Sequence, residues 1–287
     1  MTKPFLFASI GVLLVGLAMC WGLGELLLRN HPSNVPPAIT PARDMRLRTP
    51  DDISVAATFT PGRTDRSPAV LLLHCSGASR AQNAANAAWL AGLGYATLTL
   101  DFRGHGQSGA AQRSYGLFES RDARTAFDWL KHRQHGAPVA VIGSSLGGAA
   151  SLIGEQGPLP ADALVLQAVY PDIRDAIRNR IAQRLPAPFP TLLEPLLSLQ
   201  TRLRLGAWPS ELSPRSALGR FDGPVLVLGG SQDESTPREE SRRMAEAARR
   251  GSLWLVPGRE HSAMCTLADR AYRARIRIFL ARTMPTP

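Results

Sequence analysis

The sequence predicts an α/β fold, in which helices cover both faces of a mostly parallel central sheet, and three observations support this prediction. Short, continuous apolar runs such as AVLLLH (69–74) and PVAVIGS (138–144) are typical of strands buried on both faces. Helical patterns stand between successive runs, as expected of right-handed β–α–β crossovers. A chain of 287 residues with 44% hydrophobic and 20% charged residues can bury the core of one large domain.

Strands and helices alternate along most of the chain after residue 45. The predicted strands are 45–49, 52–59, 69–74, 95–101, 138–144, 163–170, 224–230 and 252–258. The predicted helices are 79–94, 117–133, 146–155, 238–250 and 266–283. In the helix over 117–133, Phe118, Ala123, Phe127 and Leu130 fall near one face, which marks the side expected to pack on the sheet.

One segment interrupts this alternation. Residues 171–215 separate two predicted strands by far more chain than one crossover helix needs. The segment begins with several arginines and continues as LPAPFPTLLEPLLSLQTRLRL (185–205). We expect it to form a helical cap insertion over the active edge of the sheet. The alternative is a long crossover with no role in substrate choice.

The first 30 residues are expected to lie outside this fold. Residues 5–24 contain no charge, and twenty such residues match the thickness of the hydrocarbon core of a bilayer. Residues 1–30 therefore predict a transmembrane anchor or a signal segment, with membrane contact through residues 5–28, and 31–44 read as a Pro-rich linker. The folded domain would occupy 45–287. We expect this domain on the extracytoplasmic (periplasmic) side, although the arginines that follow the segment favour the opposite orientation.

The net charge of +10 does not by itself predict nucleic-acid binding. The arginines are spread along the chain without a basic block or interleaved aromatic residues, so no nucleic-acid partner is expected. Attraction to an anionic membrane surface is the alternative explanation of the charge. No obligate protein partner is evident from the sequence.

The three cysteines do not form a metal-binding pattern, and no metal or organic cofactor is expected. Cys20 lies in the apolar N-terminal segment. A disulfide between Cys75 and Cys265 is possible, but the sequence alone does not decide it.

In the stretch VAVIGSSLGGAAS (139–151), a cluster of Gly and Ser residues directly follows a predicted buried strand. It could be an ordinary Gly-rich turn, a phosphate cradle, or a strained elbow that presents a nucleophilic serine. Residues 143–147 fit the pattern G-x-S-x-G, with a strand before and a small-residue helix after, which favours the elbow with Ser145 as nucleophile. The backbone N–H of Leu146 would then be one donor of an oxyanion hole.

A serine hydroxyl needs a base that takes its proton, and a base of this kind is oriented by an acid. Of the six histidines, His261 alone follows Ser145, directly after the predicted strand 252–258. Asp233, in the turn after the strand 224–230, is the candidate acid, and Asp172 is the runner-up. The second oxyanion donor is expected from the loop HCSGAS (74–79), which follows the strand 69–74.

These motifs together are similar to those of the α/β-hydrolase superfamily, from about residue 45 to 283. The matching stretches are LLLHCSG, LDFRGHGQSG, VIGSSLGGA, PVLVLGGSQDESTP and VPGREHS, and they most resemble membrane-anchored serine hydrolases and serine aminopeptidase-like members. The resemblance implies a catalytic triad of Ser145, Asp233 and His261, with Ser76 as the second oxyanion donor. One departure is Cys75, which stands where the family usually has glycine and could narrow the acyl site.

The predicted activity is therefore that of a serine hydrolase that cleaves carboxylic esters through an acyl-enzyme. A small-molecule or lipid ester is the expected substrate, because the Leu- and Pro-rich cap lies beside a membrane segment. A thioesterase, a peptidase or a catalytically silent binding module of the same fold are the alternatives. A dinucleotide site at Gly104–Gly109 is disfavoured, because a polar loop rather than a helix follows the glycines.

Overall fold

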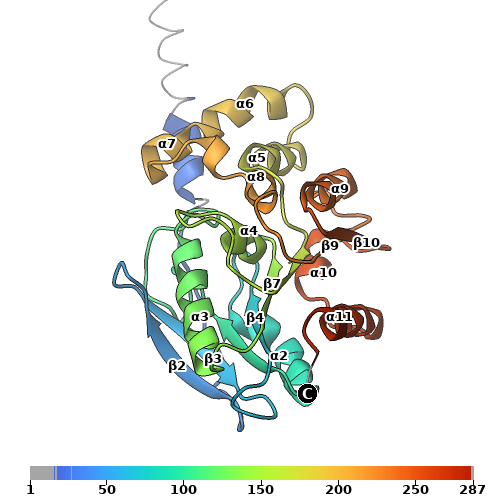
Figure 1. The fold of residues 1–287 in the computed structure, drawn as a ribbon. Helices are drawn as coiled ribbons and strands as arrows, with labels where there is room; N and C mark the ends of the chain where they lie inside the picture. Colours follow the sequence, from blue (N-terminus) through green and yellow to red (C-terminus); the bar gives the residue numbers. More distant parts are fainter. Residues whose placement is uncertain (1–15, 17, 27, 286–287) are drawn as a thin grey trace, which may run out of the picture.

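In the computed structural model, which describes residues 16, 18–26 and 28–285, the described strands build one large sheet and one small one. The large sheet has eight strands in the order β10-β9-β8-β7-β4-β5-β3-β2 (Figure 1). The strands are β2 (Arg43–Arg48), β3 (Ser54–Thr60), β4 (Ala69–Leu73), β5 (Ala96–Leu100), β7 (Val139–Ser144), β8 (Ala163–Gln167), β9 (Val225–Gly230) and β10 (Gly251–Val256). In this spatial order, each pair of neighbouring strands from β10 through β4 to β5 is parallel. Strand β3 pairs antiparallel with both β5 and β2. This is the α/β fold with a mostly parallel sheet that the sequence predicts.

Successive residues of the central strands enter opposite faces of the sheet, as the two-residue period of a strand requires. In β4, Leu71 and Leu73 pack into one apolar cluster, while Val70 and Leu72 pack into another. Because both faces are covered, β4 carries an apolar side chain at every position, which explains its continuous run in the sequence.

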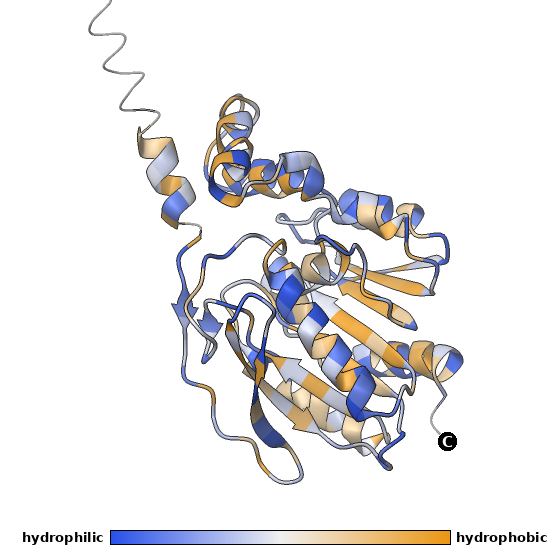
Figure 2. Ribbon diagram, turned by 60° about the vertical axis from the view of Figure 1, so that its left-hand side comes forward, coloured by the Kyte–Doolittle hydropathy of each residue, from blue (hydrophilic) through white to orange (hydrophobic). Residues whose placement is uncertain are grey.

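Helices cover each face of the sheet (Figures 1 and 2). The first face is packed by α3 (Glu119–Arg133), α4 (Leu146–Leu152), α8 (Pro214–Leu218) and α9 (Arg238–Ala247). The second is packed by α2 (Ala84–Gly92), which follows the 3₁₀ turn η1 (Arg80–Asn83), and by α10 (His261–Cys265) and α11 (Arg270–Thr283). The predicted helix over 117–133 is confirmed as α3, and Ala123, Phe127 and Leu130 are buried on its sheet-facing side.

The long insertion between β8 and β9 is helical. We call residues 171–215 the cap segment. It contains α5 (Ile173–Ala182), α6 (Phe189–Ser198), α7 (Gln200–Leu205) and η2 (Pro209–Glu211), and α8 begins at its end. In Figure 1, α5, α6 and α7 lie beyond the edge of the sheet at which α4 begins. Ile173, Ile177 and Ile181 fix α5 to the domain through buried contacts.

Two features of the chain differ in detail from the predicted elements. Helix α10 stands between β10 and α11, and its five residues are too few to show a helical period in the sequence. The region predicted as a linker, 31–44, is bound to the domain at both ends. Strand β1 (His31–Pro32) pairs in parallel with β6 (His105–Gly106), and Arg43 already belongs to β2.

The predicted membrane segment lies largely outside the described residues. Of the chain before residue 28, the structure describes residue 16 and a helix over 18–26. Within the part of the chain that the structure describes, we find no helix with the length and apolarity needed to cross a membrane.

Candidate active site

Ser145 lies at the turn between β7 and α4, in a backbone conformation that side chains rarely adopt. Its φ is 48° and its ψ is −110°. Such a conformation persists only where the surrounding structure enforces it. The neighbouring glycines make this possible, because a Cβ at Gly147 would lie 2.5 Å from the backbone oxygen of Leu73 and a Cβ at Gly148 would clash with Val169. The GSSLGG stretch is therefore a tight strand-to-helix elbow.

His261, the first residue of α10, lies between Ser145 and Asp233. Its Nε2 is 3.1 Å from Ser145 Oγ, and its Nδ1 is 2.9 Å from Asp233 Oδ2. A neutral imidazole that donates from Nδ1 to a carboxylate has Nε2 free to accept a proton from a hydroxyl. The Asp233 side chain is fully buried, whereas that of His261 is 20% exposed and reaches the solvent-filled cleft. The structure thus brings together three side chains that the sequence separates by up to 116 residues.

The carboxylate of Asp233 is held in a fixed orientation at the end of β9. Its Oδ1 accepts hydrogen bonds from the backbone N–H groups of Ser235 at 2.9 Å and Thr236 at 2.7 Å. Both oxygens are therefore engaged, and Oδ2 points to the histidine. The runner-up acid, Asp172, lies instead at the start of α5, where it is 3.6 Å from Arg215.

The two predicted oxyanion donors are the backbone N–H of Leu146, which follows Ser145, and that of Ser76, which lines the same cleft as Ser145. In the described part of the chain, the N–H of Leu146 has no hydrogen-bond partner. The N–H of Cys75 donates to Gln82 Oε1 at 3.3 Å, so the N–H of Ser76 is the next donor on that loop. The hydroxyl of Ser76 accepts a hydrogen bond from buried Arg113, which also donates to the carbonyl of Arg29 at 2.7 Å.

A disulfide and a glutamine side chain join the loop 74–79 to helix α10. Cys75 and Cys265, 190 residues apart in sequence, form a disulfide. Gln82 accepts from the Cys75 N–H and donates from Nε2 to the carbonyl of Cys265 at 2.8 Å. The pairing that the sequence left open is therefore present. It connects the loop that holds Ser76 directly to the helix that begins with His261.

His74, at the start of the same loop, has a positioning role that sequence reasoning missed. Burial lowers its pKa to about 4, so the ring is neutral at neutral pH. Nδ1 donates to the carbonyl of Cys75 at 2.7 Å, and Nε2 accepts from the N–H of Phe102 at 3.0 Å. The ring also packs edge-on against His105, whose pKa is lowered to about 3, first by burial and then by His74 and Arg113.

A second missed residue is Gln167, at the end of β8. Its Oε1 accepts from the hydroxyls of Ser144 and Tyr272, both at 3.3 Å, and its Nε2 donates to the carbonyl of Met264 at 3.4 Å. Its backbone oxygen accepts from the N–H of Ser145 at 2.8 Å. Gln167 therefore connects the elbow at Ser144 and Ser145 to Met264 of α10 through hydrogen bonds. The only signal for it in the sequence is a polar residue inside an apolar strand.

The glycine-rich turn at 104–109 belongs to the framework around the site. A Cβ at Gly106 would clash with the Asp101 carboxylate, which also accepts from the N–H of Gln107 at 2.9 Å. Arg103, directly before the turn, donates hydrogen bonds to both Asp51 and Asp122. The turn is filled by its own side chains, as expected of a structural element rather than a phosphate cradle.

The candidate site opens into a cleft of about 610 Å³. The cleft is lined by Cys75, Ser76, Gly77, Ala78, Gln82, Ser145, Arg180, Gln183, Gln232, Glu234, Ser235, Glu260, His261, Ser262 and Cys265. Arg180 and Gln183 come from α5 and its end, so the cap segment supplies one wall. The lining is mostly polar, and among the described residues no leucine of the cap segment belongs to it.

The sequence of the chain matches known protein families and individual proteins. A family model described as serine aminopeptidase, S33, matches residues 64–214, and one described as TAP-like protein matches 206–285. An uncharacterized protein of Mycobacterium tuberculosis is 31% identical over 257 residues, which cover 86% of this chain and 82% of that protein. The lysophosphatidylserine lipase ABHD12 of Rattus norvegicus is 30% identical over 167 residues, which cover 55% of this chain and 39% of the lipase.

Solved structures share the fold. The Pyrococcus furiosus esterase Pf2001 superimposes with a TM-score of 0.69 and 21% identity, covering 90% of this chain and 98% of the esterase. An esterase from Exiguobacterium antarcticum superimposes with a TM-score of 0.55 and 18% identity, covering 83% of this chain and 98% of that one. At these identities the likeness concerns the fold alone.

Proposed function

Because the chain belongs to the serine aminopeptidase S33 family of the α/β-hydrolase superfamily, we propose that it is a serine hydrolase that cleaves carboxylic esters through an acyl-enzyme. The observation that carries this proposal is the continuous hydrogen-bonded series from Ser145 Oγ through His261 to the buried carboxylate of Asp233. The strained elbow at Ser145 supports it, since strain of this kind is concentrated at functional sites.

In the acylation step, Ser145 Oγ attacks the ester carbonyl while His261 Nε2 accepts the hydroxyl proton. Asp233 stabilises the imidazolium that forms and keeps Nδ1 as its partner. The N–H groups of Leu146 and Ser76 would donate to the oxyanion of the tetrahedral intermediate, and each such donor contributes about 3–4 kcal/mol to transition-state stabilisation. The imidazolium then gives its proton to the departing alkoxide, which leaves as the alcohol.

In the deacylation step, His261 Nε2 accepts a proton from a water molecule that attacks the acyl-enzyme carbonyl. The same donors stabilise the second tetrahedral intermediate. Collapse of this intermediate releases the carboxylic acid and returns the proton to Ser145 Oγ.

We further propose that the substrate is an amphiphilic ester, such as a lipid with a polar headgroup. The polar cleft, with Arg180 on its cap-side wall, suits a polar or anionic group next to the scissile bond. The relative named lysophosphatidylserine lipase supports a lipid ester. A series of p-nitrophenyl esters of increasing acyl length tests the acyl part. If kcat/KM falls steeply beyond butyrate, a long-chain lipid substrate is wrong.

The catalytic proposal is tested with a fluorophosphonate probe on the full chain. The wild-type protein should be labelled covalently and should hydrolyse p-nitrophenyl acetate, whereas Ser145→Ala should do neither. Ser144→Ala is the matched control, because its hydroxyl points to Gln167 rather than to His261. Labelling that persists in Ser145→Ala, or a wild-type protein that neither labels nor hydrolyses esters, would refute the proposal.

We propose that the domain is anchored by residues 5–28 on the extracytoplasmic side of a membrane. The Cys75–Cys265 disulfide supports this side, because disulfides persist in oxidising compartments. Alkylating thiols in intact cells before lysis tests the idea. Cys75 and Cys265 should be protected from the alkylating reagent, and two free thiols at these positions would contradict it.

A further inference from the structure

An apolar stripe covers the outer side of helices α6 and α7. It consists of Phe189, Leu192, Leu196, Leu199 and Leu203, each between 45% and 75% exposed. The spacing of three, four, three and four residues places all five side chains on one side of a helix. We call these five residues the cap stripe. Only two other residues between 189 and 203, Thr191 and Arg202, are classed as exposed.

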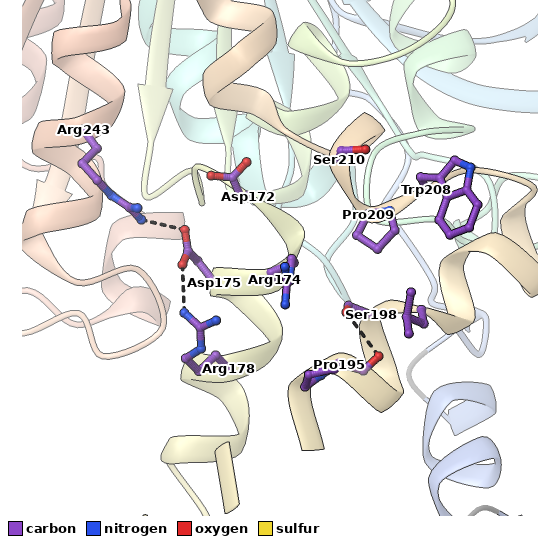
Figure 3. A pocket seen from close by; sticks show the side chains of 11 residues that line it. Asp172, Arg174, Asp175, Arg178, Pro195, Ser198, Trp208, Pro209, Ser210 and Arg243 are labelled. Carbon is purple, nitrogen blue, oxygen red and sulfur yellow. Dashed lines mark hydrogen bonds and ion pairs between the residues drawn. The ribbon is translucent and has the colours of Figure 1, made fainter. Parts of the chain in front are cut away.

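The buried side of α6 and α7 is mixed, because Leu197 and Leu205 pack into the core beside buried polar residues such as Glu194. Glu194 of α6 is only 1% exposed and forms ion pairs with Arg174 at 2.8 Å and Arg178 at 3.3 Å. Figure 3 shows part of this side, where Asp175 bridges Arg178 and Arg243. The core contacts of α6 and α7 therefore use Leu197 and Leu205, and the five residues of the cap stripe remain exposed, as expected of a surface that meets something apolar.

The N-terminal helix over 18–26 contacts α7 through polar residues next to the cap stripe. Arg204 of α7 donates to the carbonyl of Trp21 at 2.6 Å and forms an ion pair with Glu25 at 2.5 Å. Gln200 donates to the carbonyl of Cys20 at 3.1 Å. Figures 1 and 2 both show this helix beside the cap segment. Residues 18–24 of this helix belong to the uncharged stretch 5–24 that the sequence predicts to enter a membrane, and Met19, Trp21, Leu23 and Leu26 are exposed on it.

The charge around the cap stripe is positive. Between residues 176 and 210, Glu194 is the only acidic residue in the sequence, and it is already paired with arginines. Arg184 and Arg202 are exposed at the two ends of the stripe, and Arg202 also stacks on exposed Trp208. Arginine and tryptophan around an apolar surface are typical of protein that rests at the interface of an anionic bilayer.

We propose that the cap stripe docks on the surface of a lipid bilayer that contains anionic lipids. The α6–α7 helices would then lie in the interfacial plane next to the N-terminal segment, with the leucines among the acyl chains and the arginines at the headgroups. The cleft wall formed by Arg180 belongs to the same cap segment, so the mouth of the site would face the membrane side of the protein. This inference does not depend on the hydrolytic reaction.

The test measures how deeply individual positions enter the bilayer. The full chain with Cys20→Ser carries a single added cysteine, labelled with an environment-sensitive NBD dye, in nanodiscs of phosphatidylcholine and phosphatidylglycerol. Leu192→Cys reports on the cap stripe. Thr191→Cys is the matched control on the neighbouring side of the same helix, and Ile278→Cys, on α11 and 51% exposed, is the control for an apolar site elsewhere.

The expected result is a blue-shifted emission at position 192 that is quenched by nitroxide-labelled lipid, with weaker quenching at 191 and none at 278. Replacing phosphatidylglycerol with phosphatidylcholine should reduce the quenching at 192. Equal quenching at 192 and 278 would overturn the proposal. A blue shift that depends on protein concentration, without quenching by the lipid, would overturn it in favour of contact between two copies of the chain.

A second measurement keeps catalysis separate from membrane contact. In Leu192→Ser/Leu203→Ser, hydrolysis of dissolved p-nitrophenyl acetate should equal that of wild type, because neither residue lines the cleft. Hydrolysis of a fluorogenic ester embedded in vesicles should fall severalfold. If both substrates are hydrolysed at wild-type rates, the cap stripe has no role at the membrane. This outcome would leave the proposed esterase activity intact.

Discussion

The catalytic edge of the sheet and the cap segment beside it distribute polar side chains in opposite ways. At the catalytic edge, the polar groups of Asp233 and Gln167 are buried, and each is held by several hydrogen bonds. In the cap segment, α6 and α7 leave the apolar residues of the cap stripe exposed, while Leu197 and Leu205 pack into the core.

The difference indicates which part of the molecule holds the geometry of the candidate active site and which part contacts other molecules. Buried polar networks that are fully hydrogen-bonded are rigid and hold a single geometry. An exposed apolar surface has a favourable environment only where it contacts another apolar phase. We infer that the reaction is set by the catalytic edge, whereas the cap segment determines how the ester reaches it. The predictions below test each side of this comparison.

The largest effect is expected from Asp233→Asn, on the catalytic side. The amide would present a donor to His261 or lose one of its backbone donors, so the histidine would no longer hold the tautomer that accepts from Ser145. We expect kcat to fall by about 10⁴-fold, as for the corresponding change in other serine hydrolases. Asp172→Asn, at the runner-up acid, should leave kcat unchanged. The assignment fails if the two variants are equally active.

The next effect concerns the disulfide and Gln82. Cys75→Ser/Cys265→Ser should lower the free energy of unfolding by about 2–5 kcal/mol, because the link closes a long loop. It should also lower kcat by about 10- to 100-fold, with little change in KM, since the Ser76 donor and His261 lose their common support. Urea unfolding and p-nitrophenyl acetate kinetics measure the two quantities.

Gln82→Met separates positioning from stability in the same link. Alone it should reduce kcat modestly, and combined with the cysteine variant it should reduce kcat by more than the product of the two single effects, because each link compensates for the other. Cys20→Ser is the control for loss of a thiol. Multiplicative effects of Gln82→Met and the cysteine variant would show that the two links act independently.

A smaller effect is expected on the pH dependence of stability. The pKa of buried His105 lies near 3, below its ordinary value of 6.5, so the unfolded chain binds the proton first. The stability that this histidine contributes is therefore complete above about pH 6.5 and is lost as the pH falls towards 3, by up to about 3 kcal/mol at pH 4.5. Buried Asp122, with its pKa raised to about 6, acts in the opposite direction.

The difference between wild type and His105→Asn isolates the histidine. Urea unfolding at about pH 7.5 and about pH 4.5 should show a smaller loss of stability on acidification in the variant. The same loss in both proteins would mean that His105 is not the source of the acid sensitivity.

The smallest effect is expected in the cap segment, from Arg180→Gln. This side chain lines the cleft, so KM for an ester with a negative charge should rise by up to about fivefold, and high salt should reduce the difference. Neutral esters and kcat should be unaffected. Arg184→Gln removes a neighbouring arginine that does not line the cleft and should change neither. An equal effect of Arg180→Gln on neutral and anionic esters would contradict charge recognition.

How much the sequence predicts depends on the range of the interactions involved. The sheet, its helices and the elbow at Ser145 follow from local signals, namely apolar runs, helical periodicity and glycines at fixed spacing. Gln82 and Gln167 act through contacts with residues 183 and 97 positions away, which no local pattern encodes. The cap stripe was also missed as a surface, because leucines in a helix normally indicate a buried face, and here only some of the leucines, such as Leu197 and Leu205, are buried.

The link between Cys75 and Cys265 has a consequence for how the protein matures. Strands β5 to β10 all lie between the two cysteines, so the bond can form only after most of the sheet has been synthesised and has assembled. Newly made chains that are still incomplete would lack the support beneath Ser76 and His261. The full activity of the proposed hydrolase would then arise late, after folding and oxidation are both finished.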